Sequence, residues 1–262
     1  FTFLTPDRAT FAAHFTSQEE MSMMSRVLMR ALSALTVVLI VGQAHAQIPT
    51  KCLEIESILV DACNPAALCA GSSEGQNEMV RFRVGPEPIA IGDLEADWPN
   101  NTWRGLVQTT TTASITSQLN ATIASCGLLI EPVGGVIPAG ASVLLVTSTE
   151  MCVAGNSFAA LTDTLYIVFQ DAGNTSGHFA NSTVAGQPIS PIPPVGDTQR
   201  TLILFHNASG CSDTATYVRE LLLNNVGSYG GEAGESDGGT VEFSWPGVPM
   251  ATYVNFGCQA PF

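Results

Sequence analysis

The sequence predicts an all-β fold, a β-sandwich with one short helix and long loops. Residues 77–84 (N-E-M-V-R-F-R-V) alternate apolar and polar side chains with a period of two, which is the pattern of a half-buried strand. Eight or more short strand-like stretches are separated by glycine and proline turn signals. Only one stretch, residues 111–125, has the periodicity of a helix. Together these observations favour two packed sheets over a helical or mixed fold.

The strands are justified by their composition and by the turns between them. We expect strands at residues 52–60, 77–84, 128–130, 141–147, 164–170, 201–205, 214–223, 240–245 and 252–256. Alternation breaks near Ser57, which indicates a β-bulge or a fully buried strand end. The run at 141–147 is apolar at nearly every position and is expected to be buried on both faces. Pro86 ends the strand at 77–84, because proline lacks the N–H that a strand needs.

One helix is expected, over residues 111–125. Ile115, Leu119 and Ile123 recur every four residues, and Gly127 follows them as a C-terminal signal. The remaining long stretches are rich in glycine, proline or acidic residues and are expected to be loops. These loops cover residues 62–76, 185–199 and 227–239.

The front of the chain is not expected to belong to this fold. Residues 1–20 have no periodicity and are interpreted as an upstream or non-native segment. Residues 21–46 combine two arginines, the apolar run 31–41 and an Ala-His-Ala cleavage site, which is the pattern of a signal peptide. A membrane anchor is the alternative, but about a dozen apolar residues are fewer than the roughly 20 that a spanning helix needs. We therefore expect a secreted or cell-surface protein with a single domain over residues 47–262.

The expected mature domain is acidic and contains all seven cysteines. The net charge of −14 repels nucleic-acid phosphates and anionic lipids, so neither is an expected partner. Cysteines in an exported chain indicate disulfides, and an odd number leaves one thiol free, paired between chains or without its partner. Spacing does not determine the connectivity. The pairing that we name is Cys52 with Cys258, which would tie the two ends of the domain together.

A family resemblance emerges from several of these segments. The stretch at 77–84 resembles the signature strand of lamin-tail-like domains, and I-G-D-L at 91–94, I-P-A-G at 137–140 and T-D-T-L at 162–165 are similar to later segments of that family. The stretches at 52–63, 131–140 and 257–261 resemble exported domains at the front of large surface proteins of gliding bacteria. The resemblance implies an immunoglobulin-like β-sandwich that serves as a non-catalytic binding, adhesion or structural module. Arg81 departs from the family pattern, which has an acidic residue there.

Three aromatic residues are candidates for a ligand-binding surface: Trp98, Trp103 and Tyr229. Exposed aromatic side chains stack on sugars or anchor protein partners. Tryptophans near strand ends also cap sandwich cores, and this alternative stays open. If the side chains are exposed, a protein or polysaccharide at the cell surface would bind the loops around residues 93–104.

Three carboxylates form a candidate calcium site: Asp93, Glu95 and Asp97. At every second position of an extended segment, they would project from one side as an oxygen cluster suited to a hard cation. The glycine of an EF-hand loop is missing, so a solvated acidic edge is the alternative. Calcium is the one possible cofactor that we name.

Catalysis has few candidates. His178 and His206 are the histidines of the expected mature domain, and Ser157, Asp171 or Asp213 could complete a triad with one of them. We expect no enzymatic activity. A secreted hydrolase with an unrecognised site and a calcium-stabilised structural domain are the alternatives.

Overall fold

The computed structural model describes residues 51–63, 67–171, 177–179, 199–224, 237–244 and 250–257. The expected upstream segment and signal peptide lie outside these residues, as do Tyr229 and Cys258. The described residues form three β-sheets and a single α-helix, so the all-β prediction is confirmed. The immunoglobulin-like connectivity stays a prediction. No helix in the described part of the chain is both long and apolar enough to span a bilayer.

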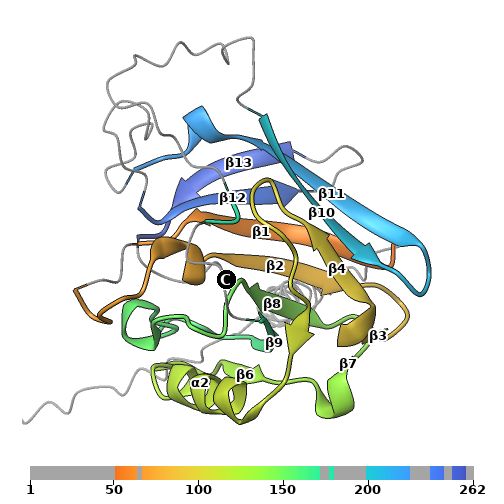
Figure 1. Cartoon of the computed structure of the whole chain (residues 1–262), viewed down its shortest axis with the longest axis horizontal. Helices are drawn as coiled ribbons and strands as arrows, with labels where there is room; N and C mark the ends of the chain where they lie inside the picture. Colours follow the sequence, from red (N-terminus) through yellow and green to blue (C-terminus); the bar gives the residue numbers. More distant parts are fainter. Residues whose placement is uncertain are drawn as a thin grey trace, which may run out of the picture. The chain divides into compact units, whose positions relative to one another are not determined.

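The main sheet has eight strands in the order β13-β12-β1-β2-β8-β9-β5, with β6 also paired to β9 (Figure 1). Its strands are β1 (Leu53–Asp61), β2 (Met79–Val84), β5 (Leu106–Val107), β6 (Leu128–Ile130), β8 (Ser142–Val146), β9 (Thr164–Gln170), β12 (Gly239–Ser244) and β13 (Met250–Asn255). Neighbours run antiparallel except that β9 is parallel to both β8 and β6. The strand predicted over 77–84 is β2. It lies near the middle of the sheet, between β1 and β8.

Two smaller sheets complete the fold. A three-stranded sheet has the order β11-β10-β4, and a third sheet pairs β3 with β7. Their strands are β4 (Leu94–Asp97), β10 (Gln199–His206), β11 (Cys211–Val218), β3 (Ile89–Ala90) and β7 (Val136–Ile137). Short 3₁₀ turns connect several strands: η1 (Glu74–Gln76), η2 (Ile91–Asp93), η3 (Val133–Gly135), η4 (Val153–Gly155) and η5 (Arg219–Leu221).

The core of the sandwich lies between the main sheet and the three-stranded sheet. Phe82 and Val143 of the main sheet pack in one buried cluster with Leu204 and Tyr217 of the smaller sheet. These residues occupy alternate positions of their strands, because side chains of a strand point to opposite faces in turn. Packing of two sheets face to face is the sandwich that the sequence predicts.

The helix α2 (Thr110–Asn120) covers part of the opposite, outer face of the main sheet, near β8 and β9 (Figure 1). The side chain of Thr109 caps its first turn by accepting hydrogen bonds from the N–H groups of Thr111 and Thr112. The expected helix end at residue 125 is wrong. The amide side chain of Asn120 bonds both the N–H and the C=O of Leu129, which stops the helix and brings the chain to β6.

The outer face is therefore divided into two parts. Leu119, Leu144 and Phe169 belong to a second apolar cluster beneath α2. The part of the face formed by β1, β2, β12 and β13 instead carries polar and charged residues, Glu56, Arg81 and Glu242 among them. This polar part is where the candidate site lies.

Candidate functional site

Trp98, expected to contribute to an exposed aromatic surface, lies in the core. It is 5% exposed, and its indole Nε1–H donates a hydrogen bond to Oε1 of Gln170 at 2.9 Å. Trp103 is half-buried against the same core, with its ring centroid 5.9 Å from that of Trp98. Of the two alternatives, the one in which a tryptophan caps the core therefore holds for Trp98, because the alternation of β4 continues beyond its end and turns this side chain inward. Tyr229 lies outside the described residues.

The three carboxylates of the expected calcium site do not act as one cluster. Asp93 belongs to the turn η2, whereas Glu95 and Asp97 lie on the exposed side of β4. Glu95 Oε2 accepts a hydrogen bond from Nδ2 of Asn207 at 3.0 Å. Among the described residues, no group of three or more His, Cys, Asp or Glu side chains is placed to hold a metal ion. The expected arrangement is wrong because its first residue lies in a turn and not in an extended segment.

His178, a candidate catalytic base, is fully buried in a hydrogen-bonded network. Glu78 Oε2 accepts hydrogen bonds from the backbone N–H of His178 at 2.6 Å and from its ring Nδ1 at 3.1 Å. The ring Nε2 lies 2.8 Å from Nε2 of Gln170, so the neutral tautomer with the proton on Nδ1 satisfies both contacts. Gln170 Nε2 also donates to the carbonyl of Thr147 at 3.0 Å.

Burial alters the protonation of this pair. Desolvation lowers the pKa of His178 from 6.5 to about 4. Desolvation raises the pKa of Glu78 well above 4.5, against the opposing effect of hydrogen bonds from the backbone N–H groups of His178 and Phe179. His178 is 0% exposed and Glu78 is 3% exposed, so a dissolved substrate does not reach either side chain. The network fastens residues 177–179 to the main sheet.

Asn77, the neighbour of Glu78, has a similar structural role. Its Oδ1 accepts hydrogen bonds from the N–H of Cys152 and from Nδ2 of Asn156, both at 2.8 Å. Its Nδ2 donates to the carbonyl of Ser73 at 2.7 Å. A disulfide between Cys69 and Cys152 joins the same two loops. The Asn-Glu pair at the start of the 77–84 motif therefore organises three loops around β2.

His206 contacts a serine, but not the one that the sequence suggested. Ser209 Oγ lies 2.8 Å from Nδ1 of His206, within the turn that joins β10 to β11. Ser157 and Asp171 are exposed elsewhere. Among the described residues, no carboxylate contacts the His206 ring. The Ser209–His206 contact spans three residues of one turn, a local pairing that serine side chains commonly make.

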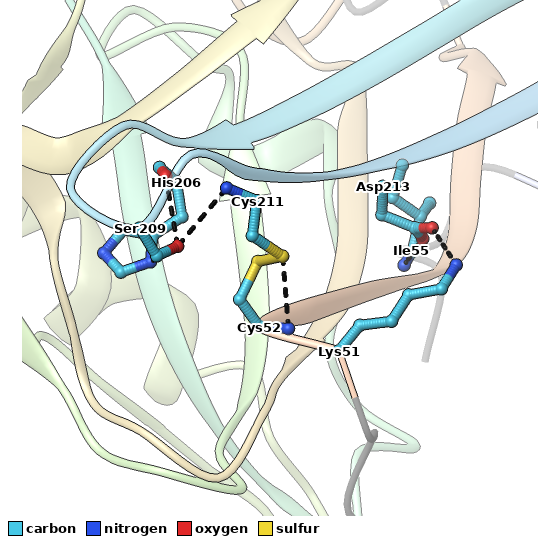
Figure 2. Close-up of a disulfide and its surroundings, with 7 residues drawn as sticks. All are labelled: Lys51, Cys52, Ile55, His206, Ser209, Cys211 and Asp213. Atoms are coloured by element: carbon cyan, nitrogen blue, oxygen red, sulfur yellow. Dashed lines mark hydrogen bonds and ion pairs between the residues drawn. A yellow bond between two sulfur atoms is a disulfide. The ribbon is translucent and has the colours of Figure 1, made fainter.

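The disulfide at the start of β1 differs from the expected pairing. Cys52 is bonded to Cys211, with the two Cα atoms 6.2 Å apart (Figure 2), so the pairing of Cys52 with Cys258 is wrong. The disulfide joins the start of β1, in the main sheet, to the start of β11, in the three-stranded sheet. The spacing of cysteines along the chain does not predict which of them meet in the fold. Among the described cysteines, Cys126 has the free thiol, and it is exposed.

Asp213, close to this disulfide, secures β1 from the side of the smaller sheet. It is 2% exposed, and its Oδ1 accepts an ion-paired hydrogen bond from Nζ of Lys51 at 2.9 Å. Its Oδ2 accepts the backbone N–H of Ile55 at 2.8 Å (Figure 2). Both carboxylate oxygens are thus engaged in structure, and Asp213 does not orient His206.

The bulge expected near Ser57 is present in β1. In the pairing with β2, Ile55 and Ser57 take neighbouring positions, so Glu56 between them is an extra residue. A regular strand would turn Ser57 toward the core, whereas the bulge leaves Glu56 and Ser57 together on the outer face. Asp213 bonds the N–H of Ile55 at this irregular position.

An open hollow of about 340 Å³, which we call the Ser57 hollow, lies on this outer face. Its lining residues are Glu56, Ser57, Arg81, Glu242, Phe243, Ser244 and Thr252. Ser57 lies opposite Arg81 of β2 on one side and opposite Glu242 of β12 on the other. Because neighbouring strands are about 4.8 Å apart, Arg81 and Glu242 project from backbones roughly 10 Å apart, with the short serine between them. The hollow is the space that this small side chain leaves.

One carboxylate holds two arginines beside the hollow. Glu56 accepts a hydrogen bond from Nε of Arg81 and another from Nε of Arg83, each at 2.9 Å. The arginine side chains are 16% and 17% exposed, and Nη2 of Arg81 lies 3.9 Å from a carboxylate oxygen of Asp163. Glu242 is exposed, and its carboxylate makes no hydrogen bond or ion pair with the described residues. It is therefore available to a ligand.

Sequence reasoning did not identify this hollow as a site. It placed Arg81 and Arg83 only on the outward face of a strand, and it treated Ser57 only as a break in alternation. That break was the available signal, because a bulge moves a side chain from one face of a sheet to the other. The contribution of Glu242 could not be found, because the pairing of β12 with β1 joins segments far apart in the sequence.

No protein-family model, curated protein or solved structure matches the chain. The lamin-tail resemblance of residues 77–84 therefore stays a prediction. The geometry of the outer face is the remaining basis for a functional proposal.

Proposed function

We propose that the chain is an exported, non-enzymatic module of a cell surface, of lamin-tail type, which binds a protein or a polysaccharide. The binding surface in this proposal is the polar outer face of the main sheet. It replaces the loops around residues 93–104, whose tryptophan Trp98 is buried.

The Ser57 hollow is the single observation that carries this proposal. Arg81 forms one wall of the hollow, which we call the arginine wall, and Glu56 already holds its side chain. A ligand therefore need not order the Arg81 side chain when it binds. Fixing a contact surface in advance reduces the free-energy cost of association. The hollow also lies on paired strands and contains an exposed carboxylate, Glu242.

Two disulfides, Cys52–Cys211 and Cys69–Cys152, support the export part of the proposal. Disulfides form and persist mainly in oxidising compartments such as the extracellular space. They agree with the signal peptide expected over residues 21–46.

Binding and turnover measurements with the purified chain test this proposal. Biolayer interferometry against purified polysaccharides and surface proteins should show saturable binding to at least one of them. Ester, glycoside and phosphodiester substrates should remain intact under the same conditions. Turnover that disappears in His178→Ala or His206→Ala would overturn the proposal.

One observation favours a second candidate, a hydrolase that uses Ser209. The 2.8 Å contact between Ser209 Oγ and His206 Nδ1 is the distance at which a histidine can accept a serine proton. This candidate requires that Ser209→Ala and His206→Ala each abolish turnover of a substrate. If the wild-type chain turns over none of the three substrate classes, this candidate fails.

A further inference from the structure

We infer that the Ser57 hollow is a binding site for an uncharged sugar unit of a polysaccharide. This inference rests on the proposed binding function and specifies its ligand class. It is argued from the dimensions of the hollow, its balance of charge and its mixture of donors and acceptors.

The dimensions suit one or two sugar rings. A volume of about 340 Å³ lies at the lower end of the roughly 300–1,000 Å³ that ligand pockets occupy. Ser57 forms the floor, and its row of cross-strand neighbours extends from Arg81 to Thr252. An open hollow on a sheet face leaves both ends of a bound sugar free to continue into a chain.

The charges around the hollow nearly cancel. Glu56 and Glu242 in the lining are negative and Arg81 is positive, and the adjoining Arg83 and Asp163 add one charge of each sign. A cation would meet the arginines, and an anionic polymer would be repelled by a chain whose net charge is −14. An uncharged ligand avoids both penalties.

The hydrogen-bonding groups match a polyhydroxylated ligand. Glu242 offers only acceptors, and the terminal nitrogens of Arg81 offer only donors. The hydroxyls of Ser57, Ser244 and Thr252 act as either. Sugar hydroxyls donate and accept at once, so they can satisfy both walls.

An NMR titration of the full chain tests this inference. The probes are uncharged tetrasaccharides built from glucose, galactose, mannose or N-acetylglucosamine. At least one should cause saturable amide shifts centred on Ser57, Arg81 and Glu242. Glu242→Gln and Ser57→Leu should each weaken that affinity about tenfold or more, because one removes an acceptor charge and the other fills the floor.

Matched variants separate the hollow from general surface effects. Glu87→Gln alters an exposed carboxylate in the turn after β2, and Ser212→Leu alters an exposed serine of β11. Both should bind the tetrasaccharide as tightly as the wild type. If Ser57→Leu does not fold, Glu242→Gln decides the test.

The failure of this inference differs from failure of the proposed function. If no uncharged tetrasaccharide binds, or if Glu242→Gln binds as tightly as the wild type, the sugar site is overturned. Saturable binding of a peptide or an acidic sugar instead would overturn the ligand class and leave the binding function intact. Substrate turnover would overturn the proposed function itself.

Discussion

Glu78 and His178 illustrate how burial affects individual residues of this chain. The lowered pKa of His178 means that its contribution to stability is present above pH 6.5 and is lost as the pH falls toward about 4. The raised pKa of Glu78 has the opposite consequence: its contribution is present below pH 4.5 and is lost as the pH rises through the folded-state pKa. In the wild type, the two effects oppose each other where the pH is above 4.5 and below 6.5.

The variant Glu78→Gln should expose the effect of His178 alone. Between pH 6.5 and 4, its free energy of unfolding should fall by roughly 3 kcal/mol, because the pKa of His178 is lowered from 6.5 to about 4 and one pKa unit corresponds to about 1.4 kcal/mol. The free energy of unfolding of the wild type should fall by less over the same range, because the protonation of Glu78 opposes the fall. Urea denaturation at half-unit pH intervals measures this difference. Parallel pH profiles for variant and wild type would show that the two side chains are not coupled to folding in this way.

Single residues also show where sequence reasoning reached its limit. The alternation in residues 77–84 identified Val80, Phe82 and Val84 as one face, and they are all buried in the sandwich core. The same rule, applied past the end of β4, would have placed Trp98 inside as well. It was not applied there, because β4 is only four residues long and its partner β10 lies far along the chain.

At the scale of the element, β1 depends on a contact from another sheet. Asp213 accepts the Ile55 N–H at the bulge and also pairs with Lys51. A buried N–H without an acceptor costs about 1–3 kcal/mol. The bulge therefore persists because a distant carboxylate compensates for it.

Replacing Asp213 tests this dependence. Asp213→Ala should lower the free energy of unfolding by about 2–3 kcal/mol, because it removes the carboxylate that accepts the hydrogen bonds of the Ile55 N–H and the Lys51 ammonium. Chemical denaturation followed by circular dichroism measures the loss. Asp97→Ala, on the exposed side of β4, serves as the control and should change stability by less than about 0.5 kcal/mol. A similar small change for Asp213→Ala would contradict the role assigned to it.

The disulfide that joins β1 to β11 allows a second test at this scale. Cys52 and Cys211 are 159 residues apart, so their bond removes much of the freedom of the unfolded chain. The double variant Cys52→Ser/Cys211→Ser should lose about 3–5 kcal/mol of stability. Cys126→Ser should lose almost none, because that thiol is free and exposed. Equal stability of the double variant and the wild type in guanidinium titrations would refute this prediction.

Elements were predicted well where local pattern determines them and poorly where distant partners do. The strands at 128–130, 141–147 and 164–170 have strong apolar runs, and they form β6, β8 and β9. The two-residue strands β3, β5 and β7 have no such signal and exist because a neighbour pairs with them. The Ser57 hollow also depends on distant partners, since its lining residues come from four strands, β1, β2, β12 and β13.

At the scale of the whole molecule, the net charge of −14 opposes compactness. Salt screens this repulsion over a distance that shrinks to about 8 Å at 0.15 M. The melting temperature should therefore rise by about 3 °C between 10 mM and 300 mM sodium chloride, if screening restores about 1 kcal/mol. Calorimetry at pH 7 measures this shift. Repeating the scan near the isoelectric point should abolish it, and a fall in melting temperature with salt at pH 7 would contradict it.

The free, exposed thiol of Cys126 is a natural site for attaching a fluorophore. Its Sγ donates to the carbonyl of Thr162, the neighbour of Asp163, whose carboxylate lies 3.9 Å from the guanidinium of Arg81. A polarity-sensitive fluorophore coupled to this thiol would sit a short tether away from the arginine wall. Occupancy could then be followed by emission intensity in a chain that needs no engineered attachment point.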